Sequence, residues 1–150
     1  MTLSEFVSLS VVLTGYPEEK LFPKQDTQKV AQEYFKKLTT AGLIPGNALA
    51  ELTAAWNAIQ TQPASQHEVL VKQNIINNPA IGRLAKNIIY MWYLAIWYDL
   101  YVEPGTYPNK DSVVSSNAYR NSLVWETMGA HPMGFSEDTF GYWKTAPASI

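Results

Sequence analysis

The side chains that most often perform acid–base or metal chemistry are sparse in this 150-residue sequence. Its only histidines, His67 and His131, lie far apart and in no spacing typical of metal ligands, such as His-x-x-Glu-His. The sequence has no cysteine, which excludes a thiolate nucleophile, a disulfide, an iron–sulfur cluster and any cysteine-based zinc site. We therefore expect neither catalytic residues nor a metal site in this chain.

The motifs that bind nucleotide cofactors and the nucleophile elbow of hydrolases are missing as well. No Gly-x-Gly-x-x-Gly follows a predicted strand, no Walker lysine occurs, and there is no Gly-x-Ser-x-Gly elbow. Serine, histidine and aspartate are all present, but without motif context they give little support to a catalytic triad. We expect no cofactor to be bound by this chain.

Asp99 is the carboxylate in the most unusual setting, because it ends the longest apolar run of the chain, Ile88 to Tyr98. A carboxylate buried there needs an arginine, an amide or water beside it. We favour a structural ion pair over a catalytic role for this residue.

Aromatic residues are the most informative feature of the sequence. A single apolar segment contains Tyr90, Trp92, Tyr93, Trp97, Tyr98 and Tyr101. One interpretation is a central core helix whose tyrosine hydroxyls reach partners at its edge. The other is that part of this aromatic surface contacts another protein, since tyrosine and tryptophan are enriched at interface cores. Both can hold for different faces of the same helix.

Charge is scarce, at 16% of residues against roughly 25% in typical domains. The net charge is −2 and the pI about 5.6, which excludes nucleic acid as a main ligand. The apolar run before Asp99 is shorter than the about 20 residues of a membrane-spanning helix, so no span is expected. Met1 to Ser10 contains no basic region and no twin arginine, so a secretory signal is expected to be absent or already removed.

Caps and apolar periodicity predict the helices that must position these residues. Thr2 and Glu5 have the form of a capping box, as do Ser65 and Glu68. The predicted helices cover about 3–14, 27–41, a stretch from the Asn47 cap to Pro63, a short stretch from Ser65 through Ile75, 79–102 and 117–128. Residues 16–25 and 103–116 are predicted to be connectors.

These elements predict an all-α fold, in which residues 1–150 form a single domain built as a compact bundle of about five to six helices. No segment alternates long enough to predict a strand with confidence. Residues 129–150 show neither the helical nor the strand periodicity of apolar residues and are expected to form an irregular, aromatic C-terminal arm.

Three segments form an ordered set across nearly the whole chain. They are Glu5-Phe-Val-Ser-Leu-Ser-Val-Val-Leu-Thr-Gly15, Tyr119-Arg-Asn-Ser-Leu-Val-Trp125, and Phe140-Gly-Tyr-Trp143 followed by Pro147. In this order, with the aromatic segment between them, they resemble the small (gamma) subunit of bacterial FAD-dependent sugar and alcohol dehydrogenase complexes. These are the sorbitol, fructose and glucose dehydrogenase type.

The resemblance implies a non-catalytic subunit that binds and stabilises a large FAD-containing catalytic subunit and helps it to mature. Such a subunit often carries its partner through the Tat pathway, and a multihaem cytochrome c usually completes the complex. The implied location is the periplasm, at the inner membrane through the complex. The expected partner interface consists of Trp92, Tyr93, Trp97, Trp125, Phe140, Tyr142 and Trp143.

Two features depart from the family pattern. Many relatives have cysteines near the carboxy-terminal Gly-Tyr-Trp-like segment, whereas Met133 to Asp138 has none, so a disulfide there is not expected. The twin-arginine leader is also missing, which is expected of either a mature chain or a member that stays in the cytoplasm.

A function of another class is the alternative: a self-sufficient small helical binding protein or enzyme with an aromatic cleft for a sugar or an apolar ligand. Flat rings can stack on a sugar face. This alternative predicts a concave pocket lined by residues such as Trp92, Tyr93 and Trp97.

Overall fold

A capping box begins the first helix in the computed structural model, which describes residues 1–102 and 110–134. The Thr2 side chain accepts a hydrogen bond from the Glu5 backbone N–H, and the Glu5 carboxylate accepts one from the Thr2 N–H. Gly15, in the left-handed region at φ 76°, closes the helix. The predicted bounds of this helix, 3–14, are confirmed.

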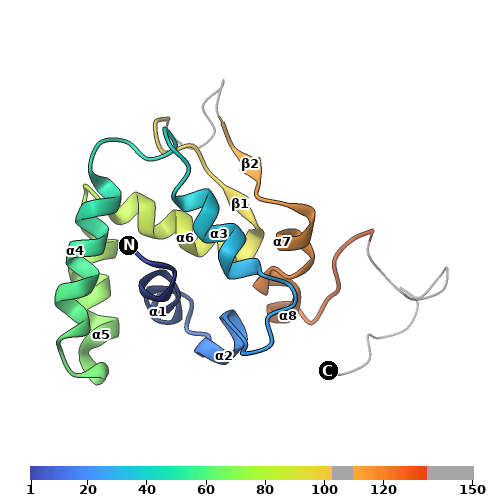
Figure 1. The fold of residues 1–150 in the computed structure, drawn as a ribbon, viewed down its shortest axis with the longest axis horizontal. Coiled ribbons are helices and arrows are strands. Elements are labelled where there is room, and N and C mark those ends of the chain that lie inside the picture. Colours follow the sequence, from blue (N-terminus) through green and yellow to red (C-terminus); the bar gives the residue numbers. More distant parts are fainter. Residues whose placement is uncertain (103–109, 135–150) are drawn as a thin grey trace.

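The described residues are mostly helical, as predicted, and the all-α class is confirmed. Figure 1 shows how the elements are arranged. They are α1 (Leu3–Thr14), α2 (Glu18–Leu21), α3 (Val30–Leu38), α4 (Ala48–Gln60), α5 (Ala64–Val71), a π-helical turn η1 (Lys72–Ile76), α6 (Gly82–Leu94), β1 (Ile96–Trp97), β2 (Ser112–Val113), α7 (Ser116–Arg120) and α8 (Leu123–Thr127).

Helix α1 lies at the centre of the fold, in contact with α2 to α6. In the view of Figure 1 it is seen nearly end-on, with α4 and α5 packed side by side next to it. Phe6 and Leu9 are completely buried on α1, as are Trp56 on α4 and Ile88 on α6. Because its apolar residues point in several directions, α1 can be covered by helices on several sides.

The helix predicted over 79–102 is shorter than the apolar run indicated, because it ends at Leu94. Ala95 takes a left-handed φ of 55° and the chain turns. Ile96 and Trp97 then pair antiparallel with Val113 and Ser112, so a short two-stranded ribbon replaces the end of the predicted helix. The run stays apolar past the turn because Trp97 is also buried, and periodicity alone cannot reveal such a break.

Other boundaries also differ from the prediction. The connector 16–25 contains α2, and the helix predicted over 117–128 is divided into α7 and α8. The prediction of a second capping box at Ser65 and Glu68 is wrong, because α5 begins at Ala64 after Pro63 and has no side-chain cap. Helix α6 begins at Gly82 instead of Pro79; a Cβ at Gly82 would lie 2.4 Å from the Ile76 carbonyl oxygen.

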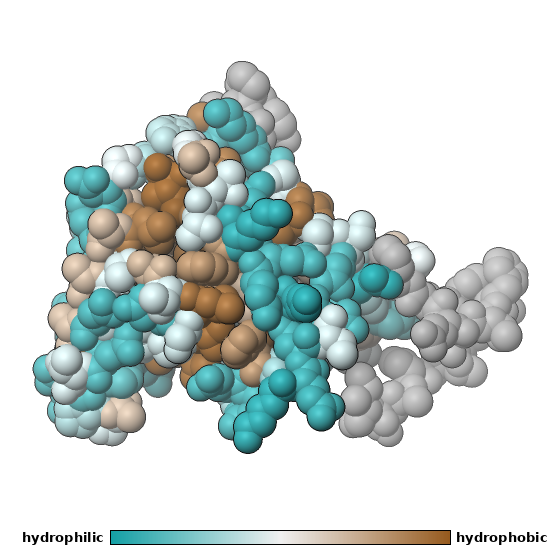
Figure 2. All heavy atoms as spheres, in the orientation of Figure 1, coloured by the Kyte–Doolittle hydropathy of each residue, from teal (hydrophilic) through white to brown (hydrophobic). Residues whose placement is uncertain are grey.

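Figure 2 shows hydrophobic side chains gathered on one face of the molecule, between α3 and α4. Half-buried residues of these elements and of the loop between them, such as Phe35, Leu43 and Leu49, pack against the core.

No helix in the described ranges is long and apolar enough to span a membrane.

Tyr34 places a hydroxyl in the core where no described residue gives it a hydrogen bond. Burial, with a smaller effect from Glu33, raises the pKa of this phenol above its usual value of 10.0. The folded state therefore holds the proton more tightly than the unfolded state, and the resulting stability is complete below pH 10 and lost as the pH rises further.

Replacing Tyr34 by phenylalanine is expected to leave stability at pH 7 unchanged or to raise it by about 1 kcal/mol, because an unpaired buried hydroxyl is removed. The loss of stability above about pH 10 should also be smaller in the variant. Thermal unfolding of the wild type and the Tyr34→Phe variant, at pH 7 and above about pH 10, measures both effects. A clear loss of stability at pH 7 would show that the hydroxyl is paired after all.

Candidate functional site

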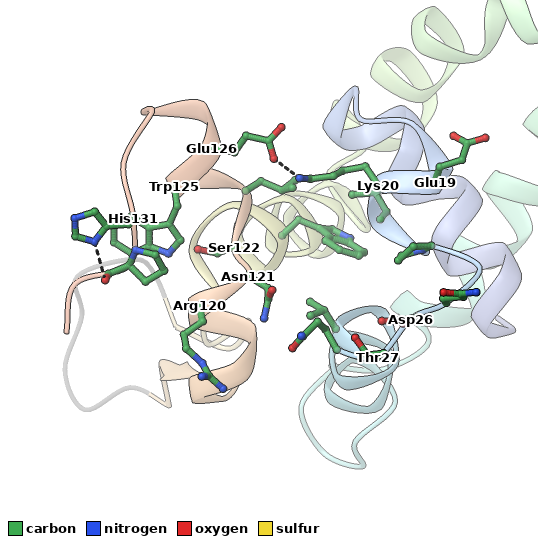
Figure 3. Close-up of a pocket in the computed structure, with 18 of the residues that line it drawn as sticks. Glu19, Lys20, Asp26, Thr27, Arg120, Asn121, Ser122, Trp125, Glu126 and His131 are labelled. Atoms are coloured by element: carbon green, nitrogen blue, oxygen red, sulfur yellow. Dashed lines mark hydrogen bonds and ion pairs between the residues drawn. The ribbon is translucent and has the colours of Figure 1, made fainter. Parts of the chain in front are cut away.

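A cleft of about 570 Å³ separates the segment from α2 to the start of α3 from the α7–α8 pair. Figure 3 shows Asp26 and Thr27 on one wall and Arg120, Asn121 and Trp125 on the other. The two walls are far apart in sequence, so only the folded chain forms the cleft.

Two interactions connect the segments that form these walls. Lys20 of α2 forms an ion pair with Glu126 of α8, drawn in Figure 3. The hydroxyls of Tyr16, just after α1, and Thr127, on α8, are hydrogen-bonded at 3.1 Å. An exposed ion pair is worth at most about 1 kcal/mol, so this one contributes little to the stability of the fold.

Trp125 is the half-buried indole in the wall formed by α7 and α8. Its Nε1 donates a 2.7 Å hydrogen bond to the Tyr119 carbonyl oxygen, and its ring meets the Tyr119 ring edge-on at 5.2 Å. The short break between α7 and α8 brings these residues together. A large ring with its polar atom already paired can offer its remaining surface to a ligand or a partner.

Trp92 also lines the cleft, from α6, but only 3% of its surface is exposed. Its ring stacks on Phe6 at 6.2 Å and meets Tyr34 edge-on at 4.9 Å. Trp92 is thus a core residue at the inner end of the cleft, as the core interpretation of the aromatic segment predicts.

Two other predicted interface residues, Tyr93 and Trp97, lie elsewhere. Trp97 is 1% exposed in β1 and belongs to the core. Tyr93 is half-buried, and its hydroxyl donates a 3.0 Å hydrogen bond to the Thr14 carbonyl oxygen. Neither lines the cleft, so the rings that the ligand-binding alternative groups with Trp92 are not in this cleft. Phe140, Tyr142 and Trp143 lie outside the described residues.

The cleft combines acidic and basic side chains with indole rings. Glu19, Asp26 and Glu126 lie among its lining residues together with Lys20 and Arg120. In the described part of the chain, no three histidine or carboxylate side chains gather as a metal site would require. The arrangement suits recognition of polar and aromatic groups by hydrogen bonds and ring contacts.

Sequence reasoning did not single out Asp26 or Asn121 as cleft residues, because no local pattern predicts that the connector after α2 faces α7.

The sequence analysis also favoured a structural ion pair for Asp99. The Asp99 carboxylate instead accepts hydrogen bonds from the backbone N–H groups of Tyr101 and Lys110, at 2.9 and 3.0 Å. Its role among the described residues is to hold the chain on both sides of the 103–109 segment.

Comparisons of this chain with protein families, with curated proteins and with solved structures gave no match.

Proposed function

We propose that this chain is a non-catalytic accessory subunit of an FAD-dependent sugar or polyol dehydrogenase complex. In this proposal it binds and stabilises the FAD-containing catalytic subunit and helps it to mature and to be exported. A multihaem cytochrome c would complete the complex, at the periplasmic side of the inner membrane. The ordered resemblance of three sequence segments to the small subunits of such complexes carries the proposal.

The relative position of two of these segments supports it. The hydroxyl of Tyr16, the residue after the first segment, bonds to Thr127, two residues after the second segment ends at Trp125. The second segment supplies Arg120, Asn121 and Trp125 to one wall of the cleft. The ends of two segments that are distant in sequence therefore lie near each other, and the second segment lines the cleft.

The surface composition gives further support. Only 16% of the residues are charged, and hydrophobic side chains gather between α3 and α4 (Figure 2). Depletion of charge and enrichment of tyrosine and tryptophan are properties of interface cores. A chain with this surface is expected to associate with itself when its partner is missing.

Affinity purification of the tagged full chain from its native host tests the proposal. We expect a large protein to copurify in stoichiometric amount, with flavin absorbance and with sugar- or polyol-dependent reduction of an artificial electron acceptor. Recovery of the chain without any flavoprotein, as a stable and monodisperse monomer, would contradict it.

The carboxy-terminal segment gives a separate prediction, drawn from the sequence alone because Phe140 and Trp143 lie outside the described residues. If these rings anchor the catalytic subunit, the double variant Phe140→Ala/Trp143→Ala should lose the complex, since truncated anchors each cost about 2 kcal/mol or more. The melting temperature of the isolated chain should stay near that of the wild type. A melting temperature several degrees lower, before any partner is added, would assign the rings to the core instead.

A further inference from the structure

Two residues that line the cleft described above each hold a buried polar atom that no described residue pairs with. One atom is Nε1 of Trp92, at the inner end of the cleft, and the other is Oδ2 of Asp26, in the connector between α2 and α3. Among the described residues, the other such side-chain atoms belong to Gln32 and Tyr34, which do not line the cleft. Because the large majority of buried polar atoms in proteins are paired, two unpaired atoms in one cleft indicate an occupant that pairs with them.

The two atoms require opposite kinds of hydrogen-bonding group. The indole N–H of Trp92 is only a donor and needs an acceptor, whereas the carboxylate oxygen of Asp26 needs a donor. A lysine or arginine side chain offers Trp92 no acceptor, and an aspartate or glutamate side chain would bring a second carboxylate next to Asp26. The occupant that suits both atoms is therefore an uncharged group that accepts and donates.

The positions of the two residues favour a carboxamide over a hydroxyl. Trp92 belongs to α6, whereas Asp26 lies on the wall formed by the connector, where Figure 3 labels it. A single hydroxyl oxygen would have to lie within hydrogen-bond distance of both atoms at once. An asparagine or glutamine side chain carries its acceptor oxygen and its donor NH2 on separate atoms, so it can serve two elements of the cleft.

The surrounding contacts leave only these two atoms to be satisfied. Oδ1 of Asp26 already accepts the Lys29 backbone N–H at 2.6 Å. The exposed side chains of Lys20 and Glu126 form an ion pair with each other, so they do not require a charged occupant. The half-buried Trp125 ring has its own N–H bonded to the Tyr119 carbonyl oxygen, and it adds apolar contact from the opposite wall.

Neither unpaired atom has exposed surface, so an occupant reaches them only when a wall of the cleft moves. The connector, residues 22–29, contains no helix or strand, and most of its residues are exposed. Segments with few buried contacts open at a lower free energy than the core does. The connector is therefore the wall that we expect to move.

We propose that the cleft receives an asparagine or glutamine side chain of the FAD-containing catalytic subunit. The oxygen of this carboxamide accepts from Trp92 Nε1, and its NH2 donates to Asp26 Oδ2. The inference rests on the proposed function and adds the chemical group that enters the cleft and the two atoms that recognise it. A buried site that fixes both a donor and an acceptor discriminates strongly against groups that leave either one unpaired.

Replacing Asp26 by asparagine tests this inference. The variant keeps an acceptor for the Lys29 N–H, but an NH2 takes the place of Oδ2 and faces the donor of the occupant. Glu51→Gln is the matched control, because it removes one negative charge at an exposed position of α4. In titrations of the copurified catalytic subunit, we expect Asp26→Asn to bind roughly tenfold more weakly than the wild type. The loss should be equal at 0.1 and 0.5 M salt, since the occupant is uncharged, and Glu51→Gln should bind as the wild type does.

The Trp92 N–H gives a second readout, in the isolated full chain labelled with ¹⁵N at its five tryptophans. Trp92→Phe identifies the signal of this indole. We expect acetamide to shift the signal, and N,N-dimethylacetamide, which cannot donate a hydrogen bond, to shift it much less. In Asp26→Asn the response to acetamide should be reduced. A larger response to glycerol than to acetamide would overturn the assignment of a carboxamide.

The two proposals fail in different ways. If the wild-type chain captures no flavoprotein, the proposed function is overturned and this inference with it. If a flavoprotein is captured but binds equally to the wild type and to Asp26→Asn, this inference alone is overturned. A Trp92 N–H signal that acetamide does not move would also overturn it, whatever the result of the capture.

Discussion

Replacing Asn87 by alanine is expected to lower the free energy of unfolding by about 3 kcal/mol. The Asn87 side chain is 1% exposed and forms two hydrogen bonds to the peptide groups of Tyr98, one as a donor and one as an acceptor. Alanine removes both bonds and leaves a partly buried N–H and C=O without partners. Each such group costs about 1–3 kcal/mol.

Thermal unfolding measures this effect. In a chain of this size, about 3 kcal/mol corresponds to a fall of roughly 6–12 °C in melting temperature. Asn74→Ala is the matched control, because Asn74 is exposed on η1. Equal melting temperatures for the two variants would mean that the segment after β1 does not depend on Asn87 for its position.

Replacing Trp125 by alanine is expected to weaken binding of the proposed FAD-containing subunit by at least about 30-fold, the equivalent of the roughly 2 kcal/mol lost at an interface anchor. Trp125 is half-buried, lines the cleft and belongs to the second segment of the family resemblance. Its indole also bonds to the Tyr119 carbonyl oxygen, so some loss of stability is expected as well.

Trp125→Phe separates these two contributions. Phenylalanine keeps an aromatic ring in the cleft wall but loses the hydrogen bond to Tyr119, so stability should fall by about 1 kcal/mol while most of the binding is retained. Titration of the purified catalytic subunit with each variant gives the affinities, and thermal unfolding gives the stabilities. A folded Trp125→Ala chain that binds as tightly as the wild type would remove Trp125 from the interface.

The sequence predicts this fold best where local chemistry decides the structure. The capping box of Thr2 and Glu5 and the glycine at position 15 define both ends of α1 within the chain itself. The end of α6 is different, because the turn at Ala95 depends on Asn87 and on pairing with Ser112 and Val113, which are distant in sequence. Apolar periodicity indicates burial, and residues on both sides of that turn are buried, so the pattern does not locate the end of the helix.

The candidate site also combines residues that the sequence singles out with residues that only the tertiary structure brings together. Trp125, which the sequence analysis predicts at the partner interface, lies in the cleft wall, whereas Trp92 and Trp97 are core residues. A tryptophan looks the same in a sequence whether its own domain or another protein covers it. The opposite wall, with Asp26, arises from tertiary packing, so no local signal marked it.

We propose that this chain supports a flavin-containing dehydrogenase subunit without performing the redox chemistry. The most direct measurement is the yield of soluble catalytic subunit, its bound FAD per polypeptide and its dehydrogenase activity, after expression with and without this chain. We expect a soluble, flavin-loaded and active catalytic subunit only when this chain is present. Equal yield, flavin content and activity in its absence would show that this chain is not the accessory subunit of that enzyme.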